Sequence, residues 1–201
     1  MNIRIKDLKI AALAAFLVAI LAIPIIDNLG LPSFLKSFGN LGVSVGLFLL
    51  TIIGFLVLWF FSRWLPILRQ VTKFIIVGGL NTFLDFAVFN LLIASSGIAA
   101  GLGLSFFKGI SFLVAVTNSY FWNKYWTFES GAKKNLEFVQ FVVISTIGLF
   151  INVGALSLIV NIIGAPGAVS PALWANIGAL IATAASLIWN FLGYKFIVFR
   201  K

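Results

Sequence analysis

The residue with the strongest potential for chemistry is Asp85, an acidic side chain within a long apolar segment. It lies eleven positions after Phe74, or about 16 Å along a helix, which would place it near the middle of a bilayer. An ionisable group at that depth is costly, so it should face protein or a wet cavity and have a partner. Lys108 is the partner we expect. The alternative is structural: Asp85 is a neutral or paired carboxyl, and the Lys108 side chain extends to the outer headgroups.

Other polar and small residues recur at helical spacing around Asp85. Asn81 and Thr82 share a helix face with it, and Asn152 occupies the corresponding place later in the chain. We predict a polar path through the membrane, with ordinary helix packing as the competing explanation of this stripe. The expected members are Asn81, Thr82, Asp85, Lys108, Ser119, Asn152 and Asn190.

Two helix ends combine a cation with aromatic rings. Lys124 and Lys195 are each followed by an aromatic residue and, four positions on, by Phe128 or Phe199. An ammonium group neutralises a lipid phosphate, and amide or phenol groups hydrogen-bond it. An aromatic belt with topology-setting cations explains a single copy equally well. The candidate lipid-phosphate ligands are Asn123, Lys124, Trp126, Tyr194 and Lys195.

The sequence holds no recognisable enzyme constellation. It has no cysteine and no histidine, which removes the thiolate, the usual proton shuttle and the commonest metal ligands. Paired carboxylates, a nucleophile with its base and a glycine-rich phosphate loop are also missing. We therefore expect no catalytic residues, no metal site and no cofactor, and predict that the chain is not an enzyme.

The composition is that of an integral membrane protein. Hydrophobic residues make up 62% of the 201 residues and charged residues only 9%, and several apolar runs reach the roughly 20 residues that span a bilayer as a helix. We predict an all-α fold with six transmembrane helices, the first ending near Ile26. The other five are expected at about 41–64, 71–95, 104–126, 137–163 and 171–197.

The last four expected helices form a tandem repeat of a two-helix unit. Phe74 and Asp85 align with Phe141 and Asn152 (141 − 74 = 67), and Lys124 aligns with Lys195 (195 − 124 = 71). We expect a two-helix extension over 1–68 and a four-helix domain over 69–201, with repeats at 69–128 and 136–201. Because each copy has two spans, the repeats should be parallel.

The charge pattern predicts the orientation. Twelve of the fourteen basic residues fall before the first span, between the second and third, between the fourth and fifth, or after the sixth. Such residues stay on the cytoplasmic side of short loops, so both termini should be cytoplasmic in a multi-pass plasma-membrane protein. The net charge of +9 then reflects anionic headgroups rather than nucleic acid.

Two motifs in the repeat resemble a known family. The pattern Phe74-Ile-Ile-Val-Gly-Gly-Leu-Asn-Thr-x-x-Asp85, followed by Asn123-Lys-Tyr-Trp-Thr-Phe128, is similar to the GtrA-like family of small polytopic membrane proteins. The resemblance covers about 69–201. Lys124 stands where the family usually has arginine, so a bidentate grip on phosphate is lost.

The resemblance implies a role in cell-surface polysaccharide or glycoconjugate synthesis. Its first form is translocation of a polyprenyl-phosphate-linked sugar, a flippase-like activity. Its second form is a non-catalytic membrane anchor or scaffold for a polyprenyl-phosphate glycosyltransferase. A third hypothesis, from the residues alone, is a small cation or drug exporter with Asp85 as the proton-exchanging carboxylate. The expected partners are the polyprenyl-phosphate sugar lipid, the membrane, a peripheral or membrane glycosyltransferase and a second copy of the chain.

Overall fold

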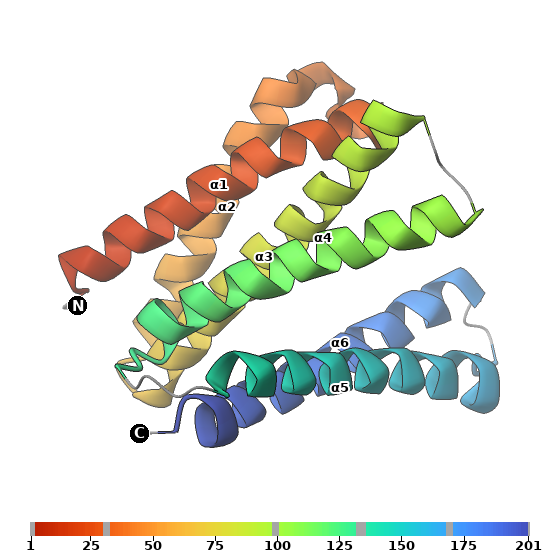
Figure 1. The fold of residues 1–201 in the computed structure, drawn as a ribbon. Coiled ribbons are helices and arrows are strands. Elements are labelled where there is room, and N and C mark those ends of the chain that lie inside the picture. The colour runs from red at the N-terminus through yellow and green to blue at the C-terminus, as the bar shows by residue number, and fades with distance from the viewer. Residues whose placement is uncertain (1–2, 30–32, 98–100, 132–135, 168–170, 201) are drawn as a thin grey trace. The chain divides into compact units, whose positions relative to one another are not determined.

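The described part of the chain is helical (Figure 1). The computed structural model describes residues 3–29, 33–97, 101–131, 136–167 and 171–200, and no strand occurs in these ranges. The prediction of an all-α fold is confirmed, and each of the six expected segments contains one long helix. These helices are α1 (Ile5–Leu29), α2 (Gly39–Phe61), α3 (Ile67–Ser96), α4 (Gly101–Trp122), α5 (Glu137–Ser157) and α6 (Pro171–Gly193). Shorter helical turns are η1 (Ser33–Phe38), η2 (Asn123–Thr127), η3 (Leu158–Ile163) and η4 (Tyr194–Val198).

Helix length and composition make this a multi-pass membrane protein. Among the described residues, three stretches are long and apolar enough to cross a bilayer: Ile5–Asp27, Gly39–Phe61 and Ile67–Ser96. Glu137–Asn152 and Ala184–Val198 are apolar but shorter. Large apolar side chains such as Phe16, Leu50 and Phe150 are exposed, as expected where lipid is the solvent. The count of six spans, their orientation and the duplication stay predictions.

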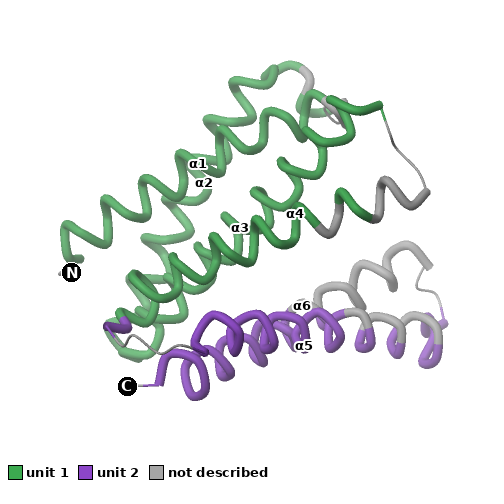
Figure 2. Tube along the Cα trace, in the orientation of Figure 1, with its two compact units in different colours: residues 1–129 green, residues 130–201 purple. Residues whose placement is uncertain are grey.

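The helices form two compact units, residues 1–129 and 130–201 (Figure 2). The first unit contains α1 to α4, and the second contains α5 and α6. The compact units divide after Glu129, and within the first of them α1 packs against α3 as well as against α2. The expected domains, 1–68 and 69–201, follow the repeat and the family resemblance, and they stay predictions.

A face of small residues on α1 allows this packing. Ala11, Ala14 and Ala15 are fully buried, and their three- to four-residue spacing puts them on one side of the helix. Small side chains let helix backbones approach closely in a membrane. The core formed there also includes Phe55 and Val77. The N-terminal helices are therefore part of the packed core of the first unit.

The second unit is held together by aromatic packing near the C-terminal end of α6. The Phe141 and Tyr194 rings are stacked, with centroids 4.1 Å apart and planes 18° from parallel. Phe199 packs against both rings. Gly193 lies against Ile144, so that a Cβ at Gly193 would come within 2.5 Å of the Ile144 Cγ2 atom. The α5–α6 pair is thus tight at this end.

Helices α4 and α6 end in the same way. Each continues into one π-helical turn, η2 or η4. The turn is closed by a hydrogen bond from the Phe128 amide to the Asn123 carbonyl, and from the Phe199 amide to the Tyr194 carbonyl, both 2.8 Å long. Isolated π turns are uncommon and often mark functional positions. The side chains around both endings are therefore candidates for a functional site.

Candidate functional site at the ends of the helices

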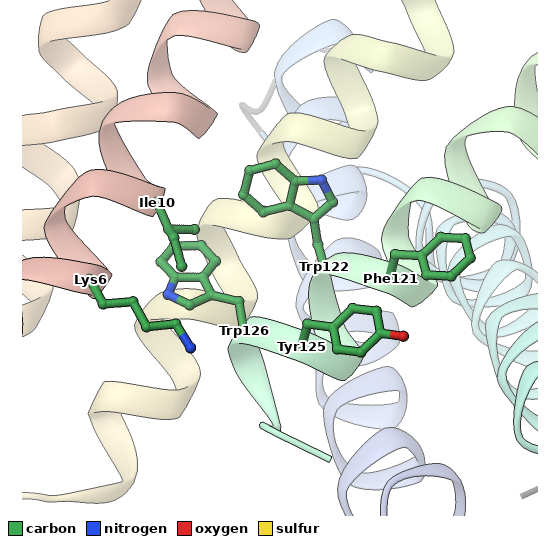
Figure 3. A pocket seen from close by; sticks show the side chains of 6 residues that line it. All are labelled: Lys6, Ile10, Phe121, Trp122, Tyr125 and Trp126. Carbon is green, nitrogen blue, oxygen red and sulfur yellow. The ribbon is translucent and has the colours of Figure 1, made fainter. Parts of the chain in front are cut away.

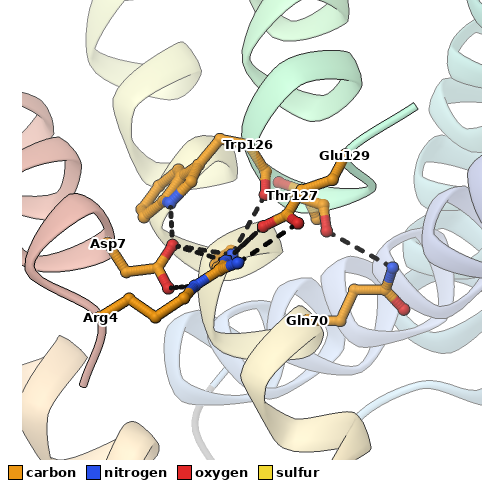
Figure 4. Close-up of polar contacts among 7 residues, drawn as sticks. Arg4, Asp7, Gln70, Trp126, Thr127 and Glu129 are labelled. Atoms are coloured by element: carbon orange, nitrogen blue, oxygen red, sulfur yellow. Dashed lines mark hydrogen bonds and ion pairs between the residues drawn. The ribbon is translucent and has the colours of Figure 1, made fainter. Parts of the chain in front are cut away.

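A buried ion pair joins α1 to α3. The Lys73 ammonium lies 2.8 Å from Asp7 Oδ1, and the two side chains are 5% and 0% exposed. Arg4 donates from Nε to Asp7 Oδ2 over 2.7 Å (Figure 4), so both carboxylate oxygens have a cationic partner. A carboxylate buried at the start of an apolar helix needs such compensation.

Residues at the end of α4 contact the same buried charges. The Trp126 indole donates to Asp7 Oδ1 over 3.0 Å, and Lys73 donates to the Trp126 carbonyl over 3.3 Å. Glu129 accepts hydrogen bonds from both Lys73 and Arg4. These contacts join α1, α3 and the turn after α4. We call the group the ionic cluster; its members are Arg4, Asp7, Lys73, Trp126 and Glu129.

Electrostatics in the ionic cluster favour the charged forms. The hydrogen bond from Arg4, followed by that from Lys73, lowers the pKa of Glu129 from its ordinary value to about 2, against the opposing effect of partial burial. The Glu129 and Asp7 carboxylates in turn raise the pKa of Arg4. Glu129 also has a positive φ of 48°, a conformation that non-glycine residues seldom adopt. Arg4 and Glu129 are therefore both charged at neutral pH.

A cavity of about 270 Å³ lies beside the ionic cluster, lined by Arg4, Asp7, Trp59, Arg69 and Lys73. Its two buried charges, on Asp7 and Lys73, neutralise each other. Lys73 already uses its three ammonium hydrogens on Asp7, Glu129 and the Trp126 carbonyl. This arrangement explains how α1 is held in place better than it explains ligand binding.

A second hollow, of about 300 Å³, lies between the start of α1 and the end of α4 (Figure 3). It is lined by Lys6, Ile10, Phe121, Trp122, Tyr125 and Trp126. We call it the aromatic groove. A third hollow, of about 560 Å³, follows α3 and α4, and we call it the hairpin cavity. Its lining comprises Leu84, Ile110, Leu113, Val114, Thr117, Asn118 and Phe121.

The residues expected to form a polar path in the first hairpin are paired across α3 and α4. Ser111 donates to Asp85 Oδ1 over 2.6 Å, and Asn118 donates to Asn81 Oδ1 over 2.8 Å. Asp85 thus has a hydroxyl donor as a described partner. The Lys108 side chain, its expected partner, lies outside the described residues.

Other expected members of the path have local partners. Thr82 donates to the Gly78 carbonyl of its own helix, and the Ser119 hydroxyl accepts from Asn123 Nδ2 over 3.2 Å. In the second unit, Asn152 donates to the Ser186 hydroxyl over 3.3 Å. Asn190 lies against Gly148, where a Cβ would collide with its amide group. The structure therefore distributes these residues over two hairpins, and the buried Asn190 Oδ1 has no hydrogen-bond partner among the described residues.

The expected phosphate ligands of the first copy are engaged with the protein. Asn123 is 1% exposed, and its amide nitrogen donates to the Ser119 carbonyl over 2.9 Å. Lys124 donates to the Tyr120 hydroxyl over 2.9 Å. Trp126, 2% exposed, belongs to the ionic cluster. In this structure the three side chains support the α4 ending rather than present donors to the surface.

The corresponding residues of the second copy differ. The Tyr194 hydroxyl is 2.6 Å from the Ser145 hydroxyl, and its ring is buried against Phe141. The Lys195 ammonium lies over the Phe196 ring, 5.3 Å from its centroid, and near Phe191. Lys195 thus contacts aromatic rings, whereas Lys124 donates to a tyrosine hydroxyl.

Sequence reasoning missed the ionic cluster. It counted Arg4 and Lys73 only as topology signals and assigned no role to Asp7 or Glu129. One available signal was Asp7 itself, because a carboxylate in the first turn of an apolar helix is costly unless a cation pairs with it. The partner, 66 positions away (73 − 7 = 66), could not be identified without the fold.

The region that contains both helical hairpins matches a known protein family. Residues 73–199 match the family model described as GtrA/DPMS, transmembrane domain. The match begins at Lys73 and ends at Phe199, so it includes both hairpins and both π-helical endings. No solved structure gives a significant match to the chain.

Proposed function

Because this chain belongs to the GtrA/DPMS transmembrane-domain family, we propose that it translocates a polyprenyl-phosphate-linked sugar across the membrane for cell-surface polysaccharide or glycoconjugate synthesis. The family supports a membrane protein of that pathway, and translocation is the specific step that we assign. Under this proposal the lipid-linked sugar is the substrate, a glycosyltransferase supplies it, and the protein itself makes and breaks no covalent bond.

The observation that carries the proposal is a succession of hollows along α4. The aromatic groove lies at the end of the helix, the hairpin cavity lies further towards its start, and Phe121 lines both. Asn118, which pairs with Asn81, lines the second hollow. A substrate with a phosphate and a sugar would meet a cation and aromatic rings first and amide groups next.

The polar pairs supply chemistry suited to a sugar. An amide offers both donors and an acceptor, and the Asp85 carboxylate offers acceptors. Within apolar surroundings, such groups replace part of the water that hydrates sugar hydroxyls. Asn81, Asp85 and Asn118 each take part in a hydrogen bond between α3 and α4. Exchange of these pairs for sugar hydroxyls is the step that we assign to Asn81, Asp85 and Asn118.

We propose a plasma-membrane location with both termini in the cytoplasm, which follows from the placement of the basic residues. In this orientation the ends of α4 and α6 face the cytoplasmic leaflet, where the lipid-linked sugar is made. Phosphate capture would then precede movement along the hairpin. Lys6, which lines the aromatic groove, and Lys195 are the cations to which we assign that capture.

The test is leaflet exchange in liposomes. Purified protein is reconstituted with a fluorescent polyprenyl-phosphate sugar, and loss of outer-leaflet signal to a membrane-impermeant quencher is followed over time. We expect exchange with the wild type, and loss of most of it in Asp85→Ala and in Asn118→Leu. Ser95→Ala is the control, because Ser95 is exposed and bonds only to the Leu92 carbonyl of its own helix.

The outcomes separate the hypotheses. Exchange that needs Asp85 and Asn118 would support translocation through the first hairpin. Equal exchange by Asp85→Ala would contradict the role of that residue. No exchange by folded wild-type protein would favour the scaffold function, for which co-purification with a glycosyltransferase is the next measurement.

A further inference from the structure

The cations near the end of α4 differ in whether the protein already uses them. Arg4 and Lys73 are paired with Asp7 and Glu129. Lys124 donates to Tyr120, and Arg63 lies over the Phe60 and Trp64 rings. Lys6 has no such engagement: in the described parts of the chain, no group accepts a hydrogen bond or ion pair from its ammonium. The Arg69 side chain likewise has no acceptor among the described residues, but it lines the cavity beside the ionic cluster rather than the aromatic groove.

Lys6 lines the aromatic groove, and two neighbouring donors are similarly unused. The Trp122 indole N–H and the Tyr125 hydroxyl have no hydrogen-bond partner among the described residues, although both side chains line the groove. The Trp126 indole, by contrast, is occupied by Asp7. Three hydrogen-bond donor groups therefore border a hollow whose lining includes no carboxylate.

The walls of the aromatic groove suit an apolar body. Phe121 and Tyr125 are stacked, with centroids 6.3 Å apart and planes 8° from parallel. Trp122 and Trp126 meet edge to face at 5.9 Å. Ile10 completes the lining from α1. Figure 3 shows the Lys6 side chain extending from α1 towards the rings of the α4 ending.

The ionic cluster holds Lys6 in this place. Asp7 follows Lys6 in the chain and is fixed to Lys73 and Trp126, so the first turn of α1 is anchored to α3 and α4. Asp7 itself is fully buried and has two cationic partners, so it contributes little negative field at the groove. One unopposed positive charge remains beside an apolar hollow.

We propose that the aromatic groove binds the phosphate of an isoprenoid lipid, with Lys6 as the charge partner and with Trp122 and Tyr125 as hydrogen-bond donors. A positive charge and neutral donors match an anionic phosphate, and the rings and Ile10 match the first isoprene units. Helix α1, which lies outside the matched family region of residues 73–199, thus supplies two of the six lining residues, including the charged one. This inference rests on the proposed function, since it names where the lipid-linked substrate is first held.

Isothermal titration calorimetry of the full chain in nonionic detergent tests the groove. Farnesyl phosphate is the probe, farnesol tests the tail alone, and inorganic phosphate tests the headgroup alone. We expect farnesyl phosphate to bind about tenfold more tightly than either fragment, because it uses both the charge and the apolar lining.

Two cations on α1 provide a matched comparison. Lys6→Gln should weaken farnesyl phosphate binding about tenfold, the usual effect of losing one charge-assisted hydrogen bond. Lys9→Gln removes the same charge from the same helix, but Lys9 does not line the groove, so affinity should stay within about twofold. Tyr125→Phe and Trp122→Phe, which keep a ring and lose one donor each, should weaken binding about threefold.

Each remaining outcome decides the proposal. Equal affinities of Lys6→Gln and Lys9→Gln, or inorganic phosphate binding as tightly as farnesyl phosphate, would overturn it. If Lys6→Gln failed to fold, unchanged binding by both Tyr125→Phe and Trp122→Phe would overturn it instead. Binding that depends on Lys6 without leaflet exchange in liposomes would leave the groove standing and remove translocation. Leaflet exchange combined with farnesyl phosphate binding that does not depend on Lys6 would support translocation and overturn the groove as the binding site.

Discussion

The endings of α4 and α6 have the same backbone and different contacts. Both are π-helical turns closed by a phenylalanine amide. At the first ending, charged side chains hold a third helix, α1, against the turn through Asp7 and Lys73. At the second, Tyr194 stacks on Phe141 of α5 and bonds to Ser145 of the same helix.

The difference shows how one backbone ending can serve two purposes. Sliding the sequence by 67 and 71 places Gln140 and Arg200 at the positions of Lys73 and Glu129 (73 + 67 = 140; 129 + 71 = 200). These two side chains cannot form an ion pair with each other. The first ending recruits an additional helix and, with it, the aromatic groove; the second is completed by its own hairpin.

The largest expected effect comes from breaking the ion pair of the first ending. Lys73→Met leaves the Asp7 carboxylate buried with one partner fewer, which should lower the free energy of unfolding by about 3 kcal/mol. The measurement is the midpoint of thermal unfolding in detergent, followed by circular dichroism. The double variant Asp7→Asn, Lys73→Met should recover much of the loss, because no buried charge then remains. A single variant as stable as the wild type would show that the cluster does not anchor α1.

A steric change should have the next largest effect, and it acts on the second ending. In Gly193→Ala the new methyl group meets the branched Ile144 side chain, which should cost about 2 kcal/mol. Gly154→Ala is the matched control, because a Cβ there meets no atom within 4 Å, and helix propensity favours alanine by up to about 1 kcal/mol. Thermal unfolding in detergent should move in opposite directions for the two variants. Equal shifts would contradict tight packing of α5 on α6 at Gly193.

Removal of one hydroxyl from the second ending should be milder. Tyr194→Phe loses the contact with Ser145 but keeps the stacked ring, and Ser145 still donates to the Phe141 carbonyl. We expect a loss of about 1 kcal/mol. Ser145→Ala and the double variant complete a cycle whose coupling energy reports the hydroxyl pair itself. Additive effects would mean that the two hydroxyls do not interact.

The smallest effect is the pH dependence of the first ending. The folded-state pKa of Glu129 is about 2, below its ordinary value of 4.5, so the unfolded chain binds more protons at acid pH. The contribution of Glu129 to stability is therefore complete above about pH 4.5 and is lost as the pH falls towards 2. Thermal midpoints between pH 6 and pH 3 should fall less steeply in Glu129→Gln than in the wild type. Parallel curves would show that Glu129 is not held by Arg4 and Lys73.

Much of the fold could be predicted because helix formation in a membrane depends on local sequence. Each backbone polar group must be satisfied within its own segment, so apolar runs of sufficient length are enough to locate the helices. The observed bounds of α2, Gly39–Phe61, and of α3, Ile67–Ser96, lie close to the expected ranges. The family motif, which depends on a few residues at fixed spacing, was also recognisable in the sequence.

The candidate site was predicted less completely because pairing depends on which helices lie next to each other. The sequence indicated that Asp85 needs a partner, and the structure provides Ser111. Charge alone could not distinguish the engaged Lys124 and Lys73 from Lys6, which lines the aromatic groove. That distinction follows from the neighbours of each ammonium group, and these neighbours come from other helices.

The sequence by itself determined a basic, all-helical membrane protein of the GtrA/DPMS family, because composition and short motifs carry that information. Only the tertiary structure decided that α1 belongs to the first compact unit. The small-residue face of α1 fits α3, and Asp7 meets Lys73, although 66 positions separate them (73 − 7 = 66). Long-range pairing of this kind depends on how the helices pack, and that packing creates both the ionic cluster and the aromatic groove.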